Sequence, residues 1–375
     1  MNKVLQVTGG MRIGGAETML MNIYRNIDRE KVQFDFLLYE KMDTPYTREI
    51  EKMGGKILVL NKKYRWDIYS YRKKFFKIIN ENGPYNVIHA HTGFNSGIPL
   101  MIANEVGIPI RICHSHFTKD GKNESIGRDM YHLLMRYIIN NNANVLLACG
   151  QAAGTAMYGT KAYQSRCEIL HNAIDTSLFL KELPKELIYK YKKEFNINDD
   201  ELVIGSIANF REAKNHIFMV NIAQLMKEKD IKFKMLFIGD GESINNIKEI
   251  VNDKGLENDI IFLGSRTDVH QIIHVFDVLL MPSLYEGFPV TLIESQTAGV
   301  PAVISKNISN EVDLGLNLIH RVDLNDNRLK WIKILISCGK TKNTKQVQRE
   351  NKLKEMGFDI YSSISKIYEL YGIKI

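Results

Sequence analysis

The sequence lacks the features that mark several classes of protein. Its 375 residues include four cysteines, which stand far apart and without the spacing of metal ligands. We therefore expect no disulfide framework, and reduced, mostly buried thiols instead. No apolar run reaches the length of a membrane span, and no secretory signal is recognisable at the start of the sequence. These absences favour a globular protein of the cytoplasm.

Two short motifs are missing as well. No Asp-x-Asp occurs anywhere, so we expect no metal ion bridging a diphosphate and no cofactor. The loop at 8–15 carries four glycines, but not in the order Gly-x-Gly-x-x-Gly. The fingerprint of dinucleotide-binding oxidoreductases is thus absent, and that class of enzyme is the least favoured.

The bulk composition is that of an ordinary globular protein. Hydrophobic residues make up 45% of the chain and charged residues 25%, and the length favours two domains. The formal net charge of +7 is compatible with binding to nucleic acid or to an anionic membrane surface, and also with no charged partner. Because no nucleic-acid motif accompanies the charge, we do not expect nucleic acid. Peripheral contact with the inner face of the cytoplasmic membrane ranks first among the functional alternatives.

Short apolar runs alternate with helical patterns in both halves of the chain. This alternation predicts α/β domains in which helices cover both faces of a parallel sheet. Beyond residue 304 the pattern thins, and the basic segment 340–354 is expected to be mostly solvated. The expected strands include 4–7, 32–38, 56–60, 86–89, 145–148, 203–208, 233–238, 260–263, 277–280 and 301–304.

The most informative stretch is the block Pro282–Pro301. Two carboxylates, Glu286 and Glu294, flank an expected turn from a buried strand towards a short helix at 295–301. The free amides of 288–291 are expected at a helix N-terminus, where the helix dipole and unpaired N–H groups suit a phosphate. The carboxylates can accept hydrogen bonds from hydroxyl groups of a sugar. The block therefore matches the two chemical parts of a sugar nucleotide.

This block has the pattern P-S-x-x-E-G-F-P-x-x-x-x-E-x-x-x-x-G-x-P. It resembles the signature of the retaining nucleotide-sugar glycosyltransferases of family four. The resemblance implies the GT-B fold, in which two Rossmann-like parallel-sheet domains face a cleft and a C-terminal helix crosses back to the N-terminal domain. It also implies an acceptor-binding domain at 1–173, a nucleotide-sugar-binding domain at 174–355 and a returning helix at 356–375.

Within the block, the resemblance assigns separate roles to the two glutamates. Glu286 would orient hydroxyls of the donor sugar as a catalytic residue, and Glu294 would accept hydrogen bonds from the nucleotide ribose. Family members are thought to react on one face of the sugar, with the departing phosphate oxygen taking the acceptor proton. The residues that follow Glu286 are expected to bind the donor: Gly287, Phe288, Pro289 and Val290.

In the N-terminal half, the resemblance implies two further groups of site residues. Gly14 and Gly15 would lie near the donor phosphates, although a tight turn that packs a helix on a strand is the alternative. A His-Ser-His run supplies a catalytic histidine against the donor sugar, either His114 or His116. His116 is favoured because it lies further beyond the strand. The histidines of 89–91 also resemble family positions.

In the C-terminal half, Lys214 matches the lysine with which the family grips the pyrophosphate. The family's arginine position is filled by Asn209, and Arg211 stands two residues later. Arg211 therefore either takes the role from a shifted position or faces solvent. Gly264 belongs to a loop that contacts the nucleotide base in the family. Arg266 in that loop either stacks over the base or faces water.

The segment 61–77 mixes cations with aromatic residues. Ile68, Tyr71, Phe75 and Ile78 keep a helical spacing within it. One interpretation is a helix that buries this stripe against the sheet and leaves a solvated basic face. The other is a helix whose basic, aromatic face lies on anionic lipid.

The resemblance implies a hexosyltransferase that uses a nucleotide-diphosphate sugar, with uridine favoured. The expected acceptor is a lipid-linked sugar or an oligosaccharide, and the expected pathway is exopolysaccharide or capsule synthesis. A sugar-nucleotide epimerase of the same fold is one alternative. A non-catalytic nucleotide-sugar-binding subunit of a polysaccharide assembly complex is another. Asn209 supports that last alternative, while Lys214 and the two glutamates argue against it.

Overall fold

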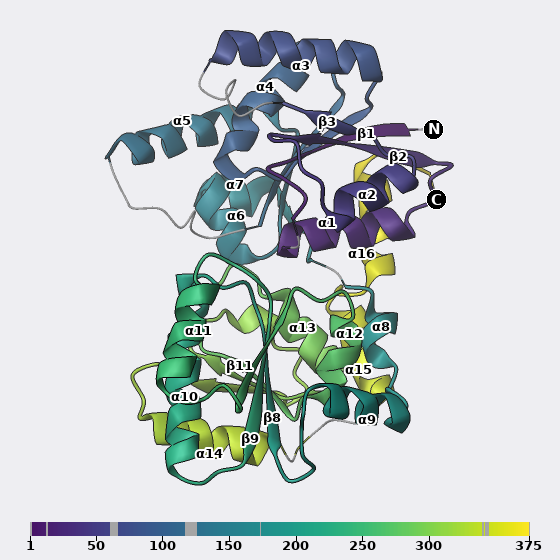
Figure 1. Cartoon of the computed structure of the whole chain (residues 1–375). Coiled ribbons are helices and arrows are strands. Elements are labelled where there is room, and N and C mark those ends of the chain that lie inside the picture. The colour runs from purple at the N-terminus through teal and green to yellow at the C-terminus, as the bar shows by residue number, and fades with distance from the viewer. Residues whose placement is uncertain are drawn as a thin grey trace. The chain divides into compact units, whose positions relative to one another are not determined.

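The computed structural model describes residues 2–12, 14–60, 67–116, 126–172, 174–339, 341 and 345–374. The chain divides into two compact units. In Figure 1 the first runs from purple to teal and includes the yellow C-terminal helix, and the second runs from teal to yellow. Unit 1 comprises Met1–Ala173 and Gly357–Ile375, and unit 2 comprises Ile174–Met356. Each unit is built on one parallel sheet flanked by helices, which confirms the predicted α/β fold with two Rossmann-like halves.

The sheet of unit 1 has seven parallel strands in the order β3-β2-β1-β4-β5-β6-β7. The strand order reverses beside β1, and open parallel sheets bind ligands at the carboxyl ends of strands near such a point. The strands are β1 (Asn2–Thr8), β2 (Val32–Leu38), β3 (Ile57–Val59), β4 (Val87–Ala90), β5 (Ile110–Ser115), β6 (Val145–Ala148) and β7 (Cys167–Ile169). The helices are α1 (Gly15–Asn26), α2 (Pro45–Lys52), α3 (Ile68–Asn82), the 3-10 helix η2 (Gly93–Ser96), α4 (Gly97–Glu105), α5 (Ile126–Asn142), α6 (Gln151–Tyr158), α7 (Thr160–Arg166) and the C-terminal α16 (Ile360–Leu370).

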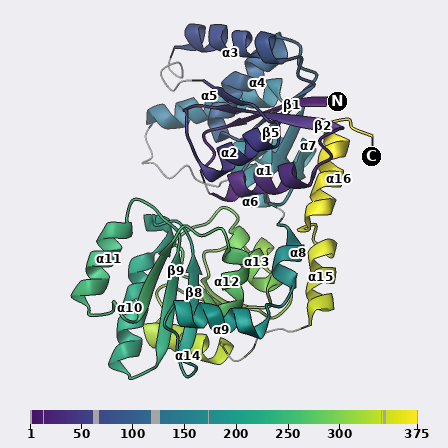
Figure 2. The same ribbon diagram turned by 45° about the vertical axis from the view of Figure 1, so that its right-hand side comes forward.

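Helices cover both faces of this sheet. On one face, α1, α2 and α16 share a core with the strands, to which Tyr24, Ile50 and Ile367 contribute. On the other face, α3, α4 and α5 share a second core through residues such as Phe75 and Ile139. Figure 2 shows α3, α4 and α5 next to one another in unit 1. The last helix of the chain therefore completes the N-terminal unit.

The sheet of unit 2 has six parallel strands in the order β10-β9-β8-β11-β12-β13. Its strands are β8 (Leu202–Ile207), β9 (Phe233–Ile238), β10 (Ile260–Gly264), β11 (Val278–Met281), β12 (Ala302–Ser305) and β13 (Ile319–Val322). Its helices are α8 (Thr176–Leu180), α9 (Lys185–Glu194), η3 (Glu212–Lys214), α10 (His216–Glu228), α11 (Ile244–Asp253), α12 (Val269–Ile272), η4 (Ile273–Val275), α13 (Val290–Thr297), η5 (Asn310–Val312), α14 (Arg328–Cys338) and α15 (Gln346–Glu355). A core around Trp331 joins α10, α11 and α14 to the sheet.

Two expectations about the chain need correction or completion. Regular structure continues beyond residue 304, because β13, α14 and α15 follow, although 340 and 342–344 lie outside the described residues. In α3, the side chains of Tyr71, Phe75 and Ile78 are buried, whereas that of Ile68 is 55% exposed. Most of the stripe therefore packs on the sheet. Residues 61–66 of that basic segment lie outside the described residues.

The described residues contain no helix that combines the length and the apolar character of a membrane span. All four cysteines are free, and Cys113, Cys149 and Cys338 are buried. The expectation that the thiols are mostly buried is thus confirmed, and their reduced state stays a prediction.

Gly205 in β8 has no room for a side chain. A Cβ atom there would lie 2.0 Å from a ring carbon of Phe276, which is fully buried beside the strand. We expect Gly205→Ala to displace this ring and to lower the free energy of unfolding by about 1–3 kcal/mol. Urea denaturation followed by circular dichroism measures the change.

Gly127→Ala in α5 is the matched control, because a Cβ atom there would meet no atom within 4 Å. This substitution should leave stability unchanged or raise it slightly, since alanine favours the helical state over glycine. Equal stability of the two variants would contradict the packing described for Gly205.

Candidate functional site

An ion pair joins the loops that follow two neighbouring strands of unit 2. Nζ of Lys214 lies 2.7 Å from each carboxylate oxygen of Glu286. Ser283 Oγ donates a further hydrogen bond to Glu286 Oε1 at 2.6 Å. The side chains of Lys214 and Glu286 are 20% and 8% exposed. Two of the three N–H donors of the ammonium group therefore face Glu286, which leaves one for an anionic ligand.

Backbone contacts hold the two loops in this arrangement. Asn215 adopts the left-handed conformation, with φ of 57° and ψ of 45°, and its Nδ2 donates to the carbonyl oxygen of Pro282 at 3.1 Å. The amide of Leu284 donates to the carbonyl oxygen of Ala213 at 2.8 Å. Left-handed backbone is unusual for a residue with a side chain, although asparagine tolerates it better than most. The turn at Asn215 thus directs Lys214 towards the loop after β11.

A glycine after β9 allows a third loop to approach. Gly239 has a φ of 139°, and a Cβ atom there would lie 2.0 Å from the carbonyl oxygen of Ala208. The amide of Phe210 donates to the carbonyl oxygen of Asp240 at 3.0 Å in the same region. Only glycine fits so close a backbone contact. The loop that carries Asn209 and Lys214 is therefore supported from the β9 side as well.

Helix α13 begins earlier than the sequence pattern predicts. It starts at Val290, directly after Pro289 in the N-cap position, rather than near residue 295. Proline fixes φ and has no N–H to leave unpaired, so it suits a helix start. No side chain of the described residues caps this start. The first amides of α13, after Gly287 and Phe288, are thus available to a ligand.

Glu294 lies on α13 rather than before a helix. Desolvation raises the pKa of its carboxyl group to about 7, since burial penalises the charged form. Near neutral pH the group is thus a mixture of protonated and ionised forms. Hydroxyl groups that donate to it would favour the ionised form and would bind more tightly as a result.

The two arginines of unit 2 have different surroundings. Arg211 is exposed at the start of η3. Arg266 contacts both carboxylate oxygens of Asp268, at 2.8 and 2.7 Å, and lies 3.2 Å from Glu194. This pairing with Arg266 lowers the pKa of Asp268 to about 2. The stacking of Arg266 on a base stays a prediction, as does base contact by Gly264, whose carbonyl accepts from the amide of Gly239 at 2.9 Å.

In unit 1, four histidines gather at the carboxyl ends of β4 and β5. His89, His91 and His114 are buried, whereas His116 is partly exposed. The ring centroids of His114 and His116 are 4.0 Å apart, and those of His89 and His91 are 4.2 Å apart. Desolvation lowers the pKa of His116 to about 4, and it also lowers the pKa values of the three buried rings well below the usual value. The cluster is therefore uncharged at neutral pH.

A hydrogen-bond chain links this cluster to the end of the sequence. Tyr371 Oη lies 3.0 Å from Nε2 of Gln6 and 2.8 Å from Nδ1 of His89. Gln6 Oε1 lies 3.0 Å from Nε2 of His91, whose Nδ1 is 2.8 Å from Nε2 of His116. Buried polar groups are stabilised only when they are paired in this way. The orientation of His116 therefore depends on residues of β1 and on the residue that follows α16.

Three of these histidines are close enough to share a metal ion. One ring nitrogen from each of His89, His91 and His114 lies within 4.8 Å of the other two, and neutral imidazoles are good ligands. Both nitrogens of His91, however, already bond Gln6 and His116. Coordination would require His91 to give up one of these bonds. The expectation that no metal takes part stays a prediction.

The glycine pair of unit 1 forms the start of α1. Gly14 is the N-cap residue, and its carbonyl oxygen accepts from the amide of Thr18 at 2.8 Å. A Cβ atom at Gly15 would meet nothing within 4 Å, so a ligand could approach the backbone there. Ile13 lies outside the described residues.

The structure thus places Lys214 and Glu286 in direct contact in unit 2, and His114 beside His116 in unit 1. The sequence did not identify Ser283, Gln6 or Tyr371 as site residues. Ser283 belongs to the recognisable block, so its position was a usable signal. Gln6 and Tyr371 are 365 positions apart, and no local pattern could have joined them.

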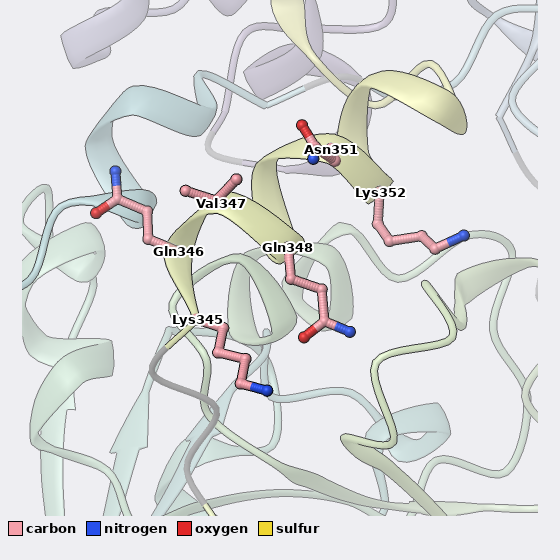
Figure 3. A pocket seen from close by; sticks show the side chains of 6 residues that line it. All are labelled: Lys345, Gln346, Val347, Gln348, Asn351 and Lys352. Carbon is pink, nitrogen blue, oxygen red and sulfur yellow. The ribbon is translucent and has the colours of Figure 1, made fainter.

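A separate open groove of about 600 Å³ lies along α15. Figure 3 shows that the residues lining it come from this helix and its start, and most are long and polar. None of the predicted site residues lines the groove, and it is not the candidate site. The lining residues are Lys345, Gln346, Val347, Gln348, Asn351 and Lys352.

Comparison with known proteins finds relatives over the whole chain. Residues 13–178 match the family model "Glycosyltransferase Family 4", and residues 188–314 match "Glycosyl transferases group 1". A Bacillus subtilis (strain 168) protein that carries the name glycosyltransferase EpsF is 36% identical over 99% of this chain and 96% of its own length.

Two more distant relatives have more specific names. The Escherichia coli protein UDP-Gal:alpha-D-GlcNAc-diphosphoundecaprenol alpha-1,3-galactosyltransferase is 24% identical over 76% of this chain and 75% of its own length. The capsular polysaccharide biosynthesis glycosyltransferase CapH of Staphylococcus aureus is also 24% identical, over 84% of each chain.

The fold is also similar to that of a solved structure. Anabaena Alr3699/HepE in complex with UDP and glucose superposes with a TM-score of 0.81 at 17% identity, over 99% of this chain and 100% of that one. At this identity the likeness concerns the fold alone. Because both halves match family models and the identity to EpsF extends over nearly the whole length, this chain belongs to family four of the glycosyltransferases, with the GT-B fold.

Proposed function

We propose that this chain is a retaining glycosyltransferase of polysaccharide biosynthesis. In this proposal it moves a hexose from a UDP-sugar to a lipid-linked sugar acceptor, in the assembly of an exopolysaccharide or a capsule. The observation that carries the proposal is the Lys214–Glu286 pair beside the uncapped start of α13. Such a site offers a cation and amides to a diphosphate and a carboxylate to sugar hydroxyls.

The relatives support the finer parts of this proposal. HepE is described with UDP and glucose, which supports a UDP-sugar donor. The name of the Escherichia coli relative specifies a diphosphoundecaprenol-linked acceptor, and that of CapH specifies capsular polysaccharide. On this basis we assign acceptor binding to residues 1–173 and donor binding to residues 174–355. The reaction then takes place at the inner face of the cytoplasmic membrane, where a lipid-linked acceptor is accessible.

In the proposed reaction the bond between the anomeric carbon and the phosphate oxygen breaks. A bond from the same face of that carbon to the acceptor oxygen forms, and the acceptor proton passes to the departing phosphate oxygen. The protein then needs to supply neither a base nor a nucleophile. Its contribution is electrostatic, because Lys214 and the amides at the start of α13 stabilise the charge that develops on the leaving diphosphate.

The other residues position the donor. Glu286, held by Lys214 and Ser283, orients hydroxyls of the sugar, and Glu294 accepts from the ribose. We assign the histidine contact with the donor sugar to His116, because it is partly exposed while His114 is fully buried. The exposed Arg211 supplies a second positive charge near the diphosphate. No metal and no cofactor are part of the proposal.

Glu286→Gln tests the role of the carboxylate. The amide keeps the shape of the side chain but loses the charge that holds Lys214 and the sugar hydroxyls. We expect the transfer rate to fall about 100-fold or more, while the affinity for UDP stays nearly constant. Sugar transfer and UDP binding are measured by product chromatography and by calorimetry, with a panel of UDP-sugars and with or without a lipid-linked acceptor.

Glu249→Gln on α11 is the control, because Glu249 is exposed and lies outside the site. Unchanged turnover of Glu286→Gln would rule out the assigned role. Release of an altered sugar nucleotide without acceptor would identify an epimerase instead. Binding without any turnover by the unmodified protein, even with acceptor, would favour a non-catalytic subunit, as the unusual Asn209 suggests.

Lys214→Met removes the cation that faces the diphosphate. We expect the transfer rate to fall about 100-fold to 1,000-fold, because the charge on the leaving group is no longer stabilised. The affinity for UDP should fall, while that for uridine should stay the same. Lys229→Met, at an exposed position on the end of α10, should change neither. Equal losses of UDP and uridine affinity in Lys214→Met would indicate a structural role only.

The pKa of Glu294 predicts a pH dependence of donor binding. Because that pKa is about 7, the ionised fraction grows about tenfold between pH 6 and pH 8. UDP affinity should therefore rise with pH across this window more steeply than in Glu294→Gln. Calorimetry is carried out on both proteins at the same pH values. The effect of the protonation of UDP itself is then common to both proteins and cancels when their affinities are compared. Parallel pH profiles of the two proteins would contradict the contact with the ribose.

Glu294 also affects the stability of the ligand-free protein. Its folded pKa lies above the unfolded value of 4.5, so the folded state binds this proton more tightly than the unfolded chain. The contribution to stability is present below pH 4.5 and is lost as the pH rises towards 7. Glu294→Gln should lack this loss, which thermal unfolding between pH 4.5 and about pH 7 measures.

A further inference from the structure

Helix α5 presents an apolar stripe to solvent. Its exposed members follow one another at intervals of four, three, one and three residues, so they lie on one side of the helix. Single exposed apolar side chains are ordinary, whereas a contiguous group marks an interaction surface. The members are Ile126, Met130, Leu133, Leu134 and Tyr137, and each is between 55% and 83% exposed. These five residues are called the α5 stripe below.

The opposite side of α5 is firmly packed. Met135 and Ile139 are buried, and Ile139 belongs to the core that α5 shares with α3 and α4. Oη of Tyr131 donates to Oδ1 of Asn95 at 2.7 Å. Nη2 of Arg136 donates to the carbonyl oxygen of Ala156 at 2.9 Å. The helix thus has a settled orientation, and turning about its axis to bury the stripe would break these contacts.

The net positive charge of the protein lies in the unit that contains α5. Unit 1 has 25 Lys and Arg residues against 17 Asp and Glu, whereas unit 2 has 25 against 26. The formal charges are thus +8 and −1. Such an asymmetry directs one unit rather than the whole molecule towards an anionic surface.

Part of this charge lies on the same face of the sheet as the α5 stripe. Helix α3 exposes Arg72, Lys73 and Lys77, and it contacts α4, which contacts α5. An ion pair at 3.0 Å between Arg72 and Glu105 joins α3 to the end of α4. Figures 1 and 2 both show the three helices next to one another. Apolar and basic groups therefore occur together on one helical face of unit 1.

We propose that the α3–α4–α5 face of unit 1 docks on an anionic lipid surface, with the α5 stripe inserted between the lipid headgroups. The inference rests on the lipid-linked acceptor of the proposed function and identifies the surface that brings the enzyme to it. Apolar side chains backed by cations are the combination that binds such a surface. Helix α3 contributes basic side chains, because most of its apolar stripe is buried against the sheet. Helix α5 contributes the exposed apolar area.

Vesicle co-sedimentation without donor or acceptor tests the docking directly. We expect the full-length protein to bind vesicles that contain phosphatidylglycerol much more strongly than vesicles of phosphatidylcholine alone. Met130→Ser combined with Leu133→Ser removes two members of the α5 stripe without adding charge. This double variant should partition at least about tenfold more weakly into phosphatidylglycerol vesicles.

The matched control replaces two equally exposed apolar residues of unit 2. Tyr189 and Val347 are 70% and 71% exposed, and Tyr189→Ser with Val347→Ser should bind as the unmodified protein does. A second pair, Lys73→Ser with Lys77→Ser, should weaken binding about fivefold or more at low salt and little at high salt. Thermal unfolding checks that each variant is folded.

Two results would overturn the proposal. One is binding to phosphatidylglycerol vesicles that is absent, or unchanged in the α5 double variant. The other is a dimer in light scattering that the α5 variant converts to a monomer, which would make the stripe a protein interface. Transfer to a water-soluble acceptor is measured in parallel. Normal transfer with no vesicle binding rejects the docking alone, whereas vesicle binding without transfer rejects the proposed function.

Discussion

The contact between Lys214 and Glu286 is the interaction on which the arrangement of the candidate site in unit 2 depends. The two residues come from loops that follow β8 and β11, and these strands are neighbours in the sheet. A partly buried carboxylate or ammonium group is costly unless it is paired. The pair satisfies both charges, and Ser283 and Asn215 fix the loops around it.

The candidate site residues of unit 1 are neutral histidines, whereas those of unit 2 include the charged pair Lys214 and Glu286. Its histidines are buried among each other and are neutral, and their order is set by hydrogen bonds through Gln6 and Tyr371. A neutral ring at the position of His116 can contact a sugar hydroxyl without attracting the diphosphate. In the proposed function, the charged diphosphate is bound by Lys214 of unit 2 instead.

The alternation of apolar runs was sufficient to predict the two parallel sheets and many of their strands. The predicted strands at 32–38 and 233–238 coincide with β2 and β9, and the residues between Ile68 and Ile78 that keep a helical spacing lie in α3. These elements are recognisable because their buried residues are consecutive or keep a helical spacing. β13 was missed because it is largely half-buried and includes His320 and Arg321. Such a strand lacks a continuous apolar run.

The site was predictable where its residues adjoin in the sequence and not where the fold brings them together. The Glu286 block could be recognised from local order alone. The sequence placed the start of the helix near residue 295 instead of at Val290, because no capping side chain in the block Pro282–Pro301 marks that start. The apolar residues of α5 have the spacing of any packed helix, and only the structure distinguishes an exposed stripe from a buried one.

The position of Tyr371 has a consequence for biosynthesis. Ribosomes release the N-terminal unit first, and domains generally fold in the order in which they emerge. Here the core that contains Phe34 and Tyr24 also requires Ile364 and Ile367 of α16. Unit 1 therefore begins to fold early but completes its core only after unit 2 has been translated. A chain that terminates before α16 therefore lacks both the Ile364 and Ile367 part of this core and the Tyr371 hydrogen bond to His89.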